Sequence, residues 1–245
     1  MKYSVFFIII SYIAVSSCKS GDAANADISK TPHLKTAAFS TGELINYEYN
    51  KAGRVSKVTN SIKGRYEYKY GDDEVTETFY DTSGTLKFTK KYRLNKDGLA
   101  SNETTVDPAN EKEKIYLYNP AQQVTTETIK EGENRQTTSY AYTSELLDSM
   151  EKRNNDYKLL HQQVYTYYPE INNTAYTYTE CLHFRGRQSP KAVKQATWIF
   201  YNAGGTEQDR QVYDYTYETD TEKRITKAVV KNAGKEVVAI SYTYY

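Results

Sequence analysis

The stretch YEYNKAGRV, from Tyr47 to Val55, decides the fold because the rest of the chain repeats it in varied form. Its two tyrosines occupy alternate positions, so both rings lie on one face of a β-strand. The following Asn and Gly53 are residues that permit a tight turn, and Val55 begins a second extended run. The stretch therefore predicts one strand, one turn and the start of the next strand.

Variants of this pattern recur at regular spacing. The second aromatic residue of six copies recurs every 21 to 26 residues, which fits one β-hairpin per repeat. Short connections predict sequential antiparallel strands, roughly 14 to 16 of them, joined as a meander. The predicted fold class is all-β: a long, twisted, curved sheet or open half-barrel. The pattern alone does not determine whether the sheet closes or splits into two lobes. The six markers are Tyr49, Tyr70, Tyr92, Tyr118, Tyr142 and Tyr167, and further copies are Phe79–Leu86, Trp198–Gly204, Tyr213–Tyr217 and Tyr242–Tyr244.

The turns and one ambiguous segment support an all-β reading. Glu145–Gln163 contains enough Leu for a helix, but its Asn-Asn-Asp centre predicts two strands and a turn. The irregular stretch Arg185–Lys191 is the longest insertion, and it is either a boundary between lobes or a long hairpin loop. The predicted turn residues are Asn50, Asp81, Asn95, Asn119 and Asn202, with further tips at Asn154–Asp156 and Asn232–Gly234.

The N-terminus has the features of a secretory signal. Lys2 precedes a short apolar run and small residues, and the run is too short to predict a membrane-spanning helix. Val15–Cys18 resembles the lipobox of bacterial lipoproteins, in which the Cys becomes lipidated; the alternative is an ordinary signal peptide with a chance Cys. We expect residues 1–17 to be a signal peptide, 18–42 a lipidated N-terminus and flexible tether, and 43–245 the β domain.

Composition limits the partners. Cleavage before Cys18 removes Lys2 and no acid, so 32 − 1 = 31 basic side chains remain against 31 acidic ones. A formally neutral chain gives no electrostatic reason to bind nucleic acid, and none is predicted as a partner. The lipid anchor predicts a membrane partner and a cell-envelope location, at the outer membrane, on either its periplasmic or its surface side.

No catalytic, metal or cofactor motif stands out, so no such residue and no cofactor is predicted, and the chain is not expected to be an enzyme. Once Cys18 is lipidated, Cys181 is alone and cannot form an internal disulfide. With His183 it falls short of a zinc site, and a buried, inert thiol is expected. His33, His161 and His183 are scattered, and Asp72–Glu74 lacks calcium-loop spacing, which favours a solvated turn.

The pattern Tyr-x-Tyr-[Asn/Asp]-x-x-Gly-x-[Val/Leu], as in Tyr47–Val55, resembles the YD repeat of Rhs-type proteins. The whole arrangement, over about residues 43–245, is similar to small YD-repeat-like lipoproteins of Bacteroidetes. Tyr70-Gly71 and Tyr168-Pro169 depart from the pattern because no Asn or Asp follows the aromatic residue. The resemblance implies a hairpin-repeat fold and no catalytic residues.

Three functions remain open. The preferred one is a noncatalytic envelope lipoprotein that binds a glycan or protein through an aromatic sheet face, at residues the sequence does not identify, since rings with hydroxyls suit such ligands. The others are a structural component of an outer-membrane complex and a carbohydrate-active hydrolase. An integral outer-membrane barrel is disfavoured because charged residues recur among the tyrosines, as in Tyr66–Asp72.

Overall fold

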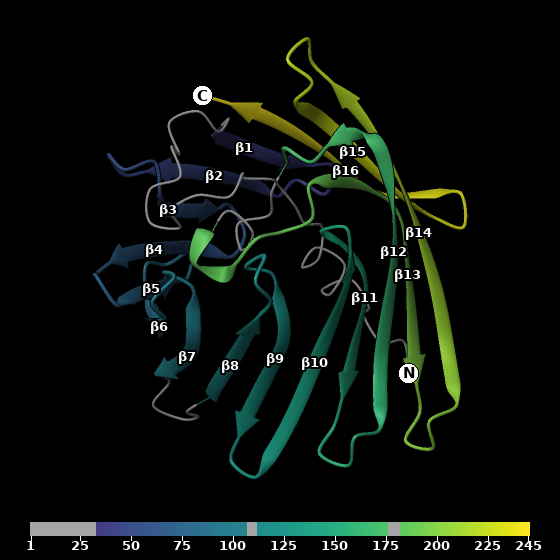
Figure 1. Cartoon of the computed structure of the whole chain (residues 1–245). Helices are drawn as coiled ribbons and strands as arrows, with labels where there is room; N and C mark the ends of the chain where they lie inside the picture. Colours follow the sequence, from purple (N-terminus) through teal and green to yellow (C-terminus); the bar gives the residue numbers. More distant parts are fainter. Residues whose placement is uncertain (1–32, 107–111, 176–181) are drawn as a thin grey trace.

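The computed structural model describes residues 33–106, 112–175 and 182–245, which form a single closed barrel of sixteen antiparallel strands (Figure 1). Each strand pairs with its neighbours in the sequence, and the first strand also pairs with the last. The strands are β1 (Leu34–Phe39), β2 (Leu44–Tyr49), β3 (Val55–Asn60), β4 (Gly64–Tyr70), β5 (Glu74–Tyr80), β6 (Leu86–Leu94), β7 (Ala100–Val106), β8 (Lys112–Tyr118), β9 (Val124–Glu131), β10 (Asn134–Thr143), β11 (Leu146–Arg153), β12 (Leu159–Asn172), β13 (Lys191–Tyr201), β14 (Glu207–Thr219), β15 (Ile225–Asn232) and β16 (Lys235–Tyr244).

Closure of the sheet overturns the expected open sheet or half-barrel. Ala37 of β1 pairs with Tyr242 of β16, and Phe39 pairs with Ile240. An open sheet would present two edges of unpaired N–H and C=O groups, and the ladder between β1 and β16 removes both. The meander itself is as predicted, since every other ladder joins strands that are consecutive in the sequence.

The strand that closes the barrel lies within the range 18–42 that we expected to be a tether. Leu34 and Ala37 are buried in the barrel interior, so this part of the range is folded. The barrel therefore includes Leu34–Phe39, and a domain boundary at residue 43 is too late. Cys18 and the predicted signal peptide lie outside the described residues.

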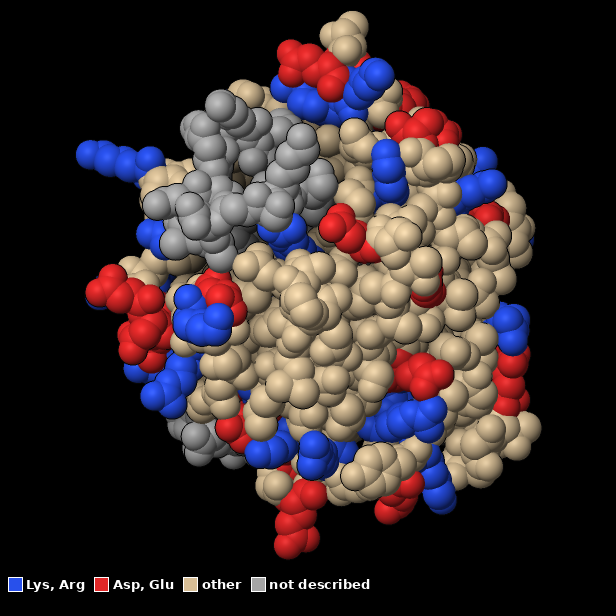
Figure 2. All heavy atoms as spheres, in the orientation of Figure 1, with Lys and Arg blue, Asp and Glu red and all other residues tan. Residues whose placement is uncertain are grey.

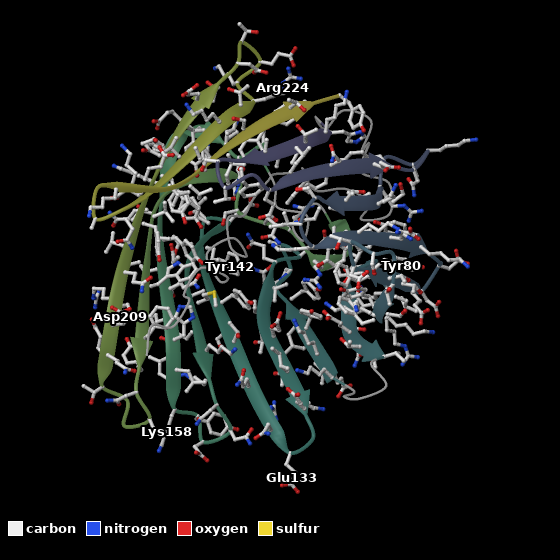
Figure 3. All side chains as sticks on the ribbon, turned by 180° about the vertical axis from the view of Figure 1, so that it is seen from behind. Tyr80, Glu133, Tyr142, Lys158, Asp209 and Arg224 are labelled. Carbon is white, nitrogen blue, oxygen red and sulfur yellow. The ribbon has the colours of Figure 1, made fainter. Side chains whose placement is uncertain are left out.

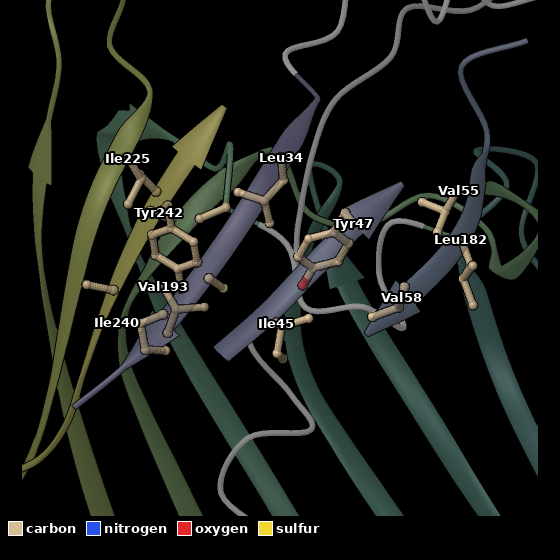
Figure 4. Packing of buried hydrophobic residues seen from close by; sticks show 14 of the residues in the cluster. Leu34, Ile45, Tyr47, Val55, Val58, Leu182, Val193, Ile225, Ile240 and Tyr242 are labelled. Atoms are coloured by element: carbon tan, nitrogen blue, oxygen red, sulfur yellow. The ribbon is translucent and has the colours of Figure 1, made fainter. Parts of the chain in front are cut away.

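The tyrosine pairs face the barrel interior. Tyr47 is 1% exposed and Tyr92 is not exposed, and Figure 4 shows Tyr47 near Leu34, Ile45 and Val58 in the packed interior. The residues between the tyrosines point outward, as Lys69 does between Tyr68 and Tyr70 of β4. The alternation of the repeat therefore determines which side chains of each strand face the barrel interior.

The second tyrosine of the repeat also has a specific hydrogen bond, which explains why it is not Phe. In six even-numbered strands its hydroxyl, toward the end of the strand, donates to a backbone carbonyl at or near the start of the preceding strand, and a buried phenol needs such an acceptor. In β6, Leu94 stands at this position and has no hydroxyl. The bonds run from Tyr49 to Leu34 (2.8 Å), Tyr70 to Val55 (2.8 Å), Tyr118 to Ala100 (2.8 Å), Tyr167 to Leu147 (2.9 Å), Tyr217 to Val193 (2.9 Å) and Tyr244 to Ile225 (2.8 Å).

Within the described residues, seven turns share one geometry. Six of them start at predicted positions, and the turn at Asp220 is not among the predicted ones, whereas the predicted tip at Asn232–Gly234 joins β15 to β16 without this geometry. An Asn or Asp side-chain oxygen accepts the backbone N–H of the residue four positions later, and the residue before that donor has positive φ. Gly fills the positive-φ position in four of these turns, as at Gly53 with φ 70°. The turns start at Asn50, Asp81, Asn95, Asn119, Asn154, Asn202 and Asp220.

The segment Glu145–Gln163 forms strand, turn and strand, as predicted: β11 ends at Arg153 and β12 begins at Leu159. The insertion Arg185–Lys191 is not a lobe boundary, because it belongs to the connection between two paired strands, β12 and β13. Among the described residues, no helix has the length and apolar character that a membrane crossing requires.

The tyrosine hydrogen bonds predict a specific stability effect. Tyr118→Phe should lower the free energy of unfolding by about 1 kcal/mol, because the Ala100 carbonyl loses its donor while the ring is kept. Tyr157→Phe is the matched control, since that ring is 77% exposed in a turn. Urea denaturation of both variants measures the difference, and equal stabilities would contradict the role of the hydroxyl.

A close approach of two backbones predicts a second effect. A Cβ at Gly64 would overlap the Tyr80 carbonyl oxygen and lie 2.7 Å from the Asp81 carbonyl carbon, whereas a Cβ at Gly132 would meet nothing within 4 Å. Gly132, with φ 58°, lies in the left-handed region that an alanine can adopt at modest cost, whereas Gly64, with φ 122°, lies outside it, so backbone strain adds to the overlap at Gly64. We expect Gly64→Ala to cost more than about 3 kcal/mol and Gly132→Ala about 1 kcal/mol in unfolding free energy. Thermal denaturation checks this, and similar costs would refute the close approach.

Candidate functional site

The described parts of the connection between β12 and β13, residues 173–175 and 182–190, lie at one end of the barrel, the end at which even-numbered strands finish. On one side, Thr174 contacts the last strands: its hydroxyl accepts the Ile225 N–H at 2.7 Å, and its carbonyl lies 3.0 Å from the Tyr244 hydroxyl, whose single hydrogen it shares with the Ile225 carbonyl. These bonds fix the start of the connection against β15 and β16.

The remainder of the connection reaches the opposite wall. Phe184, in the short 3₁₀ helix His183–Arg185, packs against Tyr92 with ring centroids 4.8 Å apart. Arg187 donates its N–H to the Gln122 carbonyl at 2.8 Å, in the turn between β8 and β9. Because the connection contacts both sides of the wall and Phe184 is buried, it forms a plug at this end. Below, "the plug" means the described residues 173–175 and 182–190.

A buried charge cluster fastens the plug to the wall. Arg185 of the plug contacts Glu103 of β7 at 3.1 Å and donates to the Tyr92 hydroxyl at 2.8 Å. Tyr116 donates its hydroxyl to the same carboxylate, and Lys90 lies 3.2 Å from it. Glu103 is 1% exposed, so this carboxylate is tolerated in the interior because cations and donors surround it.

The pKa values follow from this arrangement. Burial alone would raise the pKa of Glu103, but the charges of Arg185, Lys114 and Lys90 and the Tyr116 hydrogen bond outweigh it and lower the pKa to about 2. Burial raises the pKa of Tyr116 well above its ordinary value. Glu103 is therefore an anion and Tyr116 a neutral donor at physiological pH, which suits a structural fastening.

The interior becomes wetter toward the other end. Lys114, Lys90 and Lys112 all face inward from β6 and β8, yet their side chains are 27%, 21% and 45% exposed. Figure 3 places Glu133 and Lys158 at the tips of the long hairpins at this end, and Arg224 at the opposite end. Side chains that point inward and remain exposed show that the barrel interior is open to solvent here; we call this space the lumen.

One row of lumen side chains combines aromatic rings with charges. Lys152, His161, Phe200 and Asp209 are successive register partners on β11, β12, β13 and β14. His161 and Phe200 stack with centroids 4.7 Å apart and planes 13° apart. Burial and then the charge of Lys152 lower the pKa of His161 to about 4, so its ring is neutral at physiological pH. We call these four residues the lumen row.

The next row toward the plug is polar and more deeply buried. Gln163, Trp198 and Gln211 are register partners on β12, β13 and β14. Trp198 is 3% exposed and packs against Tyr213 with centroids 5.3 Å apart. Its indole N–H is buried and has no acceptor among the described residues. A buried donor without an acceptor is unusual in a folded protein.

The outer wall carries charges of both signs. Acidic and basic side chains lie next to one another around the margins of the face shown in Figure 2. A lipid-facing barrel wall needs a continuous apolar band, and paired charges near both ends of the strands reduce the height of wall that such a band could occupy. Pairs on the outer wall join Lys57 to Glu48 (2.8 Å), Lys130 to Glu113 (3.2 Å) and Lys227 to Glu218 (2.8 Å).

The residues singled out from the sequence are dispersed. His33 stacks on Tyr49 with centroids 4.4 Å apart, whereas His161 faces the lumen. Asp72–Glu74 spans the turn into β5, as expected, and no group of metal-ligand residues occurs among the described residues. Cys18 and Cys181 lie outside the described residues. Of the residues in this set that the structure describes, none are brought together in one site.

Sequence reasoning missed the lumen row and the charge cluster. A usable signal existed for His161, because it alternates with Gln163 and Tyr165 and so shares their inward face. No local signal predicts that Arg185 meets Glu103, 82 positions away, since the plug brings them together.

No protein-family model matches the chain, and no curated protein matches it. Among solved structures, the barrel is similar to a porin-like protein from Bacteroides uniformis ATCC 8492. The TM-score is 0.59 and the sequence identity 20%, over 86% of this chain and 95% of that one. The chain has a porin-like β-barrel fold. At this identity the likeness concerns the fold alone.

Two weaker similarities involve the N-terminal domain of the effector protein SpvB from Salmonella typhimurium strain LT2 and the TcdB2-TccC3-TEV structure. Their TM-scores are 0.33 and 0.22, with identities of 11% and 12%. The match to SpvB covers 93% of this chain and 92% of that one. The match to the TcdB2-TccC3-TEV structure covers 83% of this chain and 15% of that one. At these TM-scores neither supports an argument, and the YD-repeat resemblance stays a prediction.

The charge cluster predicts a pH dependence. The pKa of Glu103 is about 2 in the folded state against an ordinary 4.5, so its contribution to stability is present above about pH 4.5 and is lost as the pH falls through about 2. Glu103→Gln should therefore lower stability at neutral pH and flatten its acid dependence, whereas Glu48→Gln on the outer wall should do neither. Urea midpoints at about pH 7 and about pH 3 measure this. An acid dependence that is unchanged in Glu103→Gln would contradict the cluster's role.

Proposed function

We propose that the protein is a noncatalytic cell-envelope lipoprotein whose plugged barrel binds a ligand, a glycan or a protein segment, in its open lumen. The observation that carries this proposal is the contrast between the two ends. One end is covered by the plug, and inward-facing side chains at the other end, such as Lys112, remain exposed. A concave interior with aromatic and polar groups is the usual setting for ligand binding.

The geometry argues against passage of solutes through the barrel, although porins have the same number of strands. The plug is held by backbone bonds, as between Arg187 and Gln122, and by the ion pair of Arg185 with Glu103. The paired charges on the outer wall favour contact with water over contact with lipid chains. These features support a cup held at a membrane rather than a pore within it.

A lipid anchor at Cys18 would connect to the plugged end. The first described strand begins at Leu34, next to the end of β16, and Tyr245 donates its N–H to the His33 carbonyl at 3.0 Å. The chain thus enters the barrel beside the plug. Anchoring at this end would leave the open lumen facing away from the membrane surface, which suits a protein that receives a ligand from the envelope space.

A structural role in an outer-membrane complex is the second candidate. Leu117 of β8 is 57% exposed and Val164 of β12 is 39% exposed, and both face outward. Exposed apolar side chains on an outer wall suit docking of another protein. Crosslinking in cells distinguishes the two candidates, because a docking role requires a stoichiometric partner at native expression and ligand binding in the lumen does not.

Cell fractionation tests the proposal. The full chain, expressed in a bacterial host that processes lipoproteins, should incorporate labelled fatty acid and sediment with the membranes. Cys18→Ser should lose the label and appear in the water-soluble fraction, because about 0.8 kcal/mol per buried methylene of the acyl chains is lost.

Carbonate extraction and bilayer recordings complete the test. If Cys18→Ser remains in the membrane after carbonate treatment, the barrel itself inserts and the proposal is wrong. The purified full chain should give no conductance steps in planar bilayers, whereas stable steps would indicate a pore and contradict the plugged cup.

A further inference from the structure

We propose that the lumen row, Lys152, His161, Phe200 and Asp209, is a binding site for an uncharged saccharide. This inference deepens the ligand-binding function proposed above and rests on it, because it specifies where the ligand binds and what its chemistry is.

The row is assembled by strand register and does not depend on a flexible loop. Its residues come from four adjacent strands, and each is the register partner of the next. Side chains on neighbouring strands at paired positions lie close together on one face of the sheet. The row therefore presents its rings and charged groups side by side on a rigid wall.

The aromatic part suits the apolar face of a sugar ring. His161 and Phe200 stack nearly parallel, and both keep partial exposure to the lumen. One face of each ring is covered by the other ring, and C–H groups can pack on the remaining faces and edges, which are uncharged because the imidazole is neutral at physiological pH. Fully buried tyrosines of the repeat, such as Tyr92, cannot serve this purpose, since their rings are not exposed to the lumen.

The charged part suits hydroxyl groups. Lys152 at one end of the row is a donor, and Asp209 at the other end is an acceptor, so the row carries one positive and one negative charge. Charges of opposite sign favour a neutral ligand that both donates and accepts hydrogen bonds over an anion or a cation. Asp209 is exposed and is oriented by the Gln211 amide, which donates to it at 2.8 Å.

The row beneath supplies a second, independent observation. The indole N–H of Trp198 is buried without an acceptor, and Trp198 lies between Gln163 and Gln211 in register. An unsatisfied buried donor costs free energy, and an acceptor that enters from the lumen would remove that cost. A sugar hydroxyl, or a water that it orders, supplies such an acceptor. His161 links the two rows, because its ring meets the Trp198 ring edge-on at 5.8 Å.

The test uses an array of defined uncharged oligosaccharides, probed with the full chain and then with matched variants by calorimetry. Asp209→Asn keeps the size of the side chain and removes its charge, and Phe200→Leu removes the ring. Asp214→Asn is the control, because it is the same substitution on the outer face of the same strand, where Asp214 likewise accepts a Gln amide at 2.8 Å. We expect each lumen variant to weaken sugar binding by about tenfold or more, with the control unchanged.

Three outcomes would overturn the inference. If an oligosaccharide binds with an affinity that neither Asp209→Asn nor Phe200→Leu changes, the site lies elsewhere, although the proposed ligand-binding function is retained. A protein segment that binds the lumen row in place of any sugar refutes the saccharide class but retains the function. Failure of the array together with failure to crosslink any envelope ligand in cells removes both. Thermal melts of Phe200→Leu separate lost binding from lost folding. If Phe200→Leu unfolds, Asp209→Asn still tests the site, because Asp209 is exposed and its substitution should leave the fold intact.

Discussion

The pairing of β1 with β16 is the constraint on which the rest of the structure depends. It joins residues more than 200 positions apart and turns a meander with two open edges into a barrel with an inside and an outside. Once the sheet is closed, the alternation of a strand assigns every tyrosine pair to the interior and the residues between them to the outer wall. The plug and the lumen exist only because there is an interior for them to occupy.

A sixteen-stranded barrel is too wide for its wall side chains to fill. The two ends of this barrel differ in what occupies the remaining space. At one end, tyrosine rings and the plug fill the space, and tyrosine hydroxyls such as that of Tyr217 satisfy backbone carbonyls. At the other end, inward-facing lysines and the lumen row remain exposed or partly exposed to solvent. The charge cluster around Glu103 lies between these regions and secures the plug.

Local features of this structure can be predicted from the sequence, whereas contacts between residues far apart in the chain cannot. Hairpins, turn residues and the Asn-centred turn between β11 and β12 are readable because Asn154 and its neighbours act within five positions of the chain. Closure is not readable, because Leu34–Phe39 is short and lacks the tyrosine pair of the repeat, and its partner β16 lies at the other end of the chain. The lumen row is similarly hidden: Lys152 and Asp209 belong to no repeat, and only the register across β11 to β14 aligns them.

A disulfide across the closing seam tests the account most directly. The hydroxyl oxygens of Thr36 on β1 and Thr243 on β16 lie 2.7 Å apart on the outer wall. With Cys18 and Cys181 replaced by Ser, the pair Thr36→Cys and Thr243→Cys should form an intramolecular disulfide on mild oxidation, and Thr36→Cys with Ser149→Cys on β11 should not. A closed barrel predicts quantitative crosslinking of the first pair, seen as faster migration on a non-reducing gel. Free thiols at both positions in the folded protein would show an open sheet and contradict the closed barrel, its plug and its lumen.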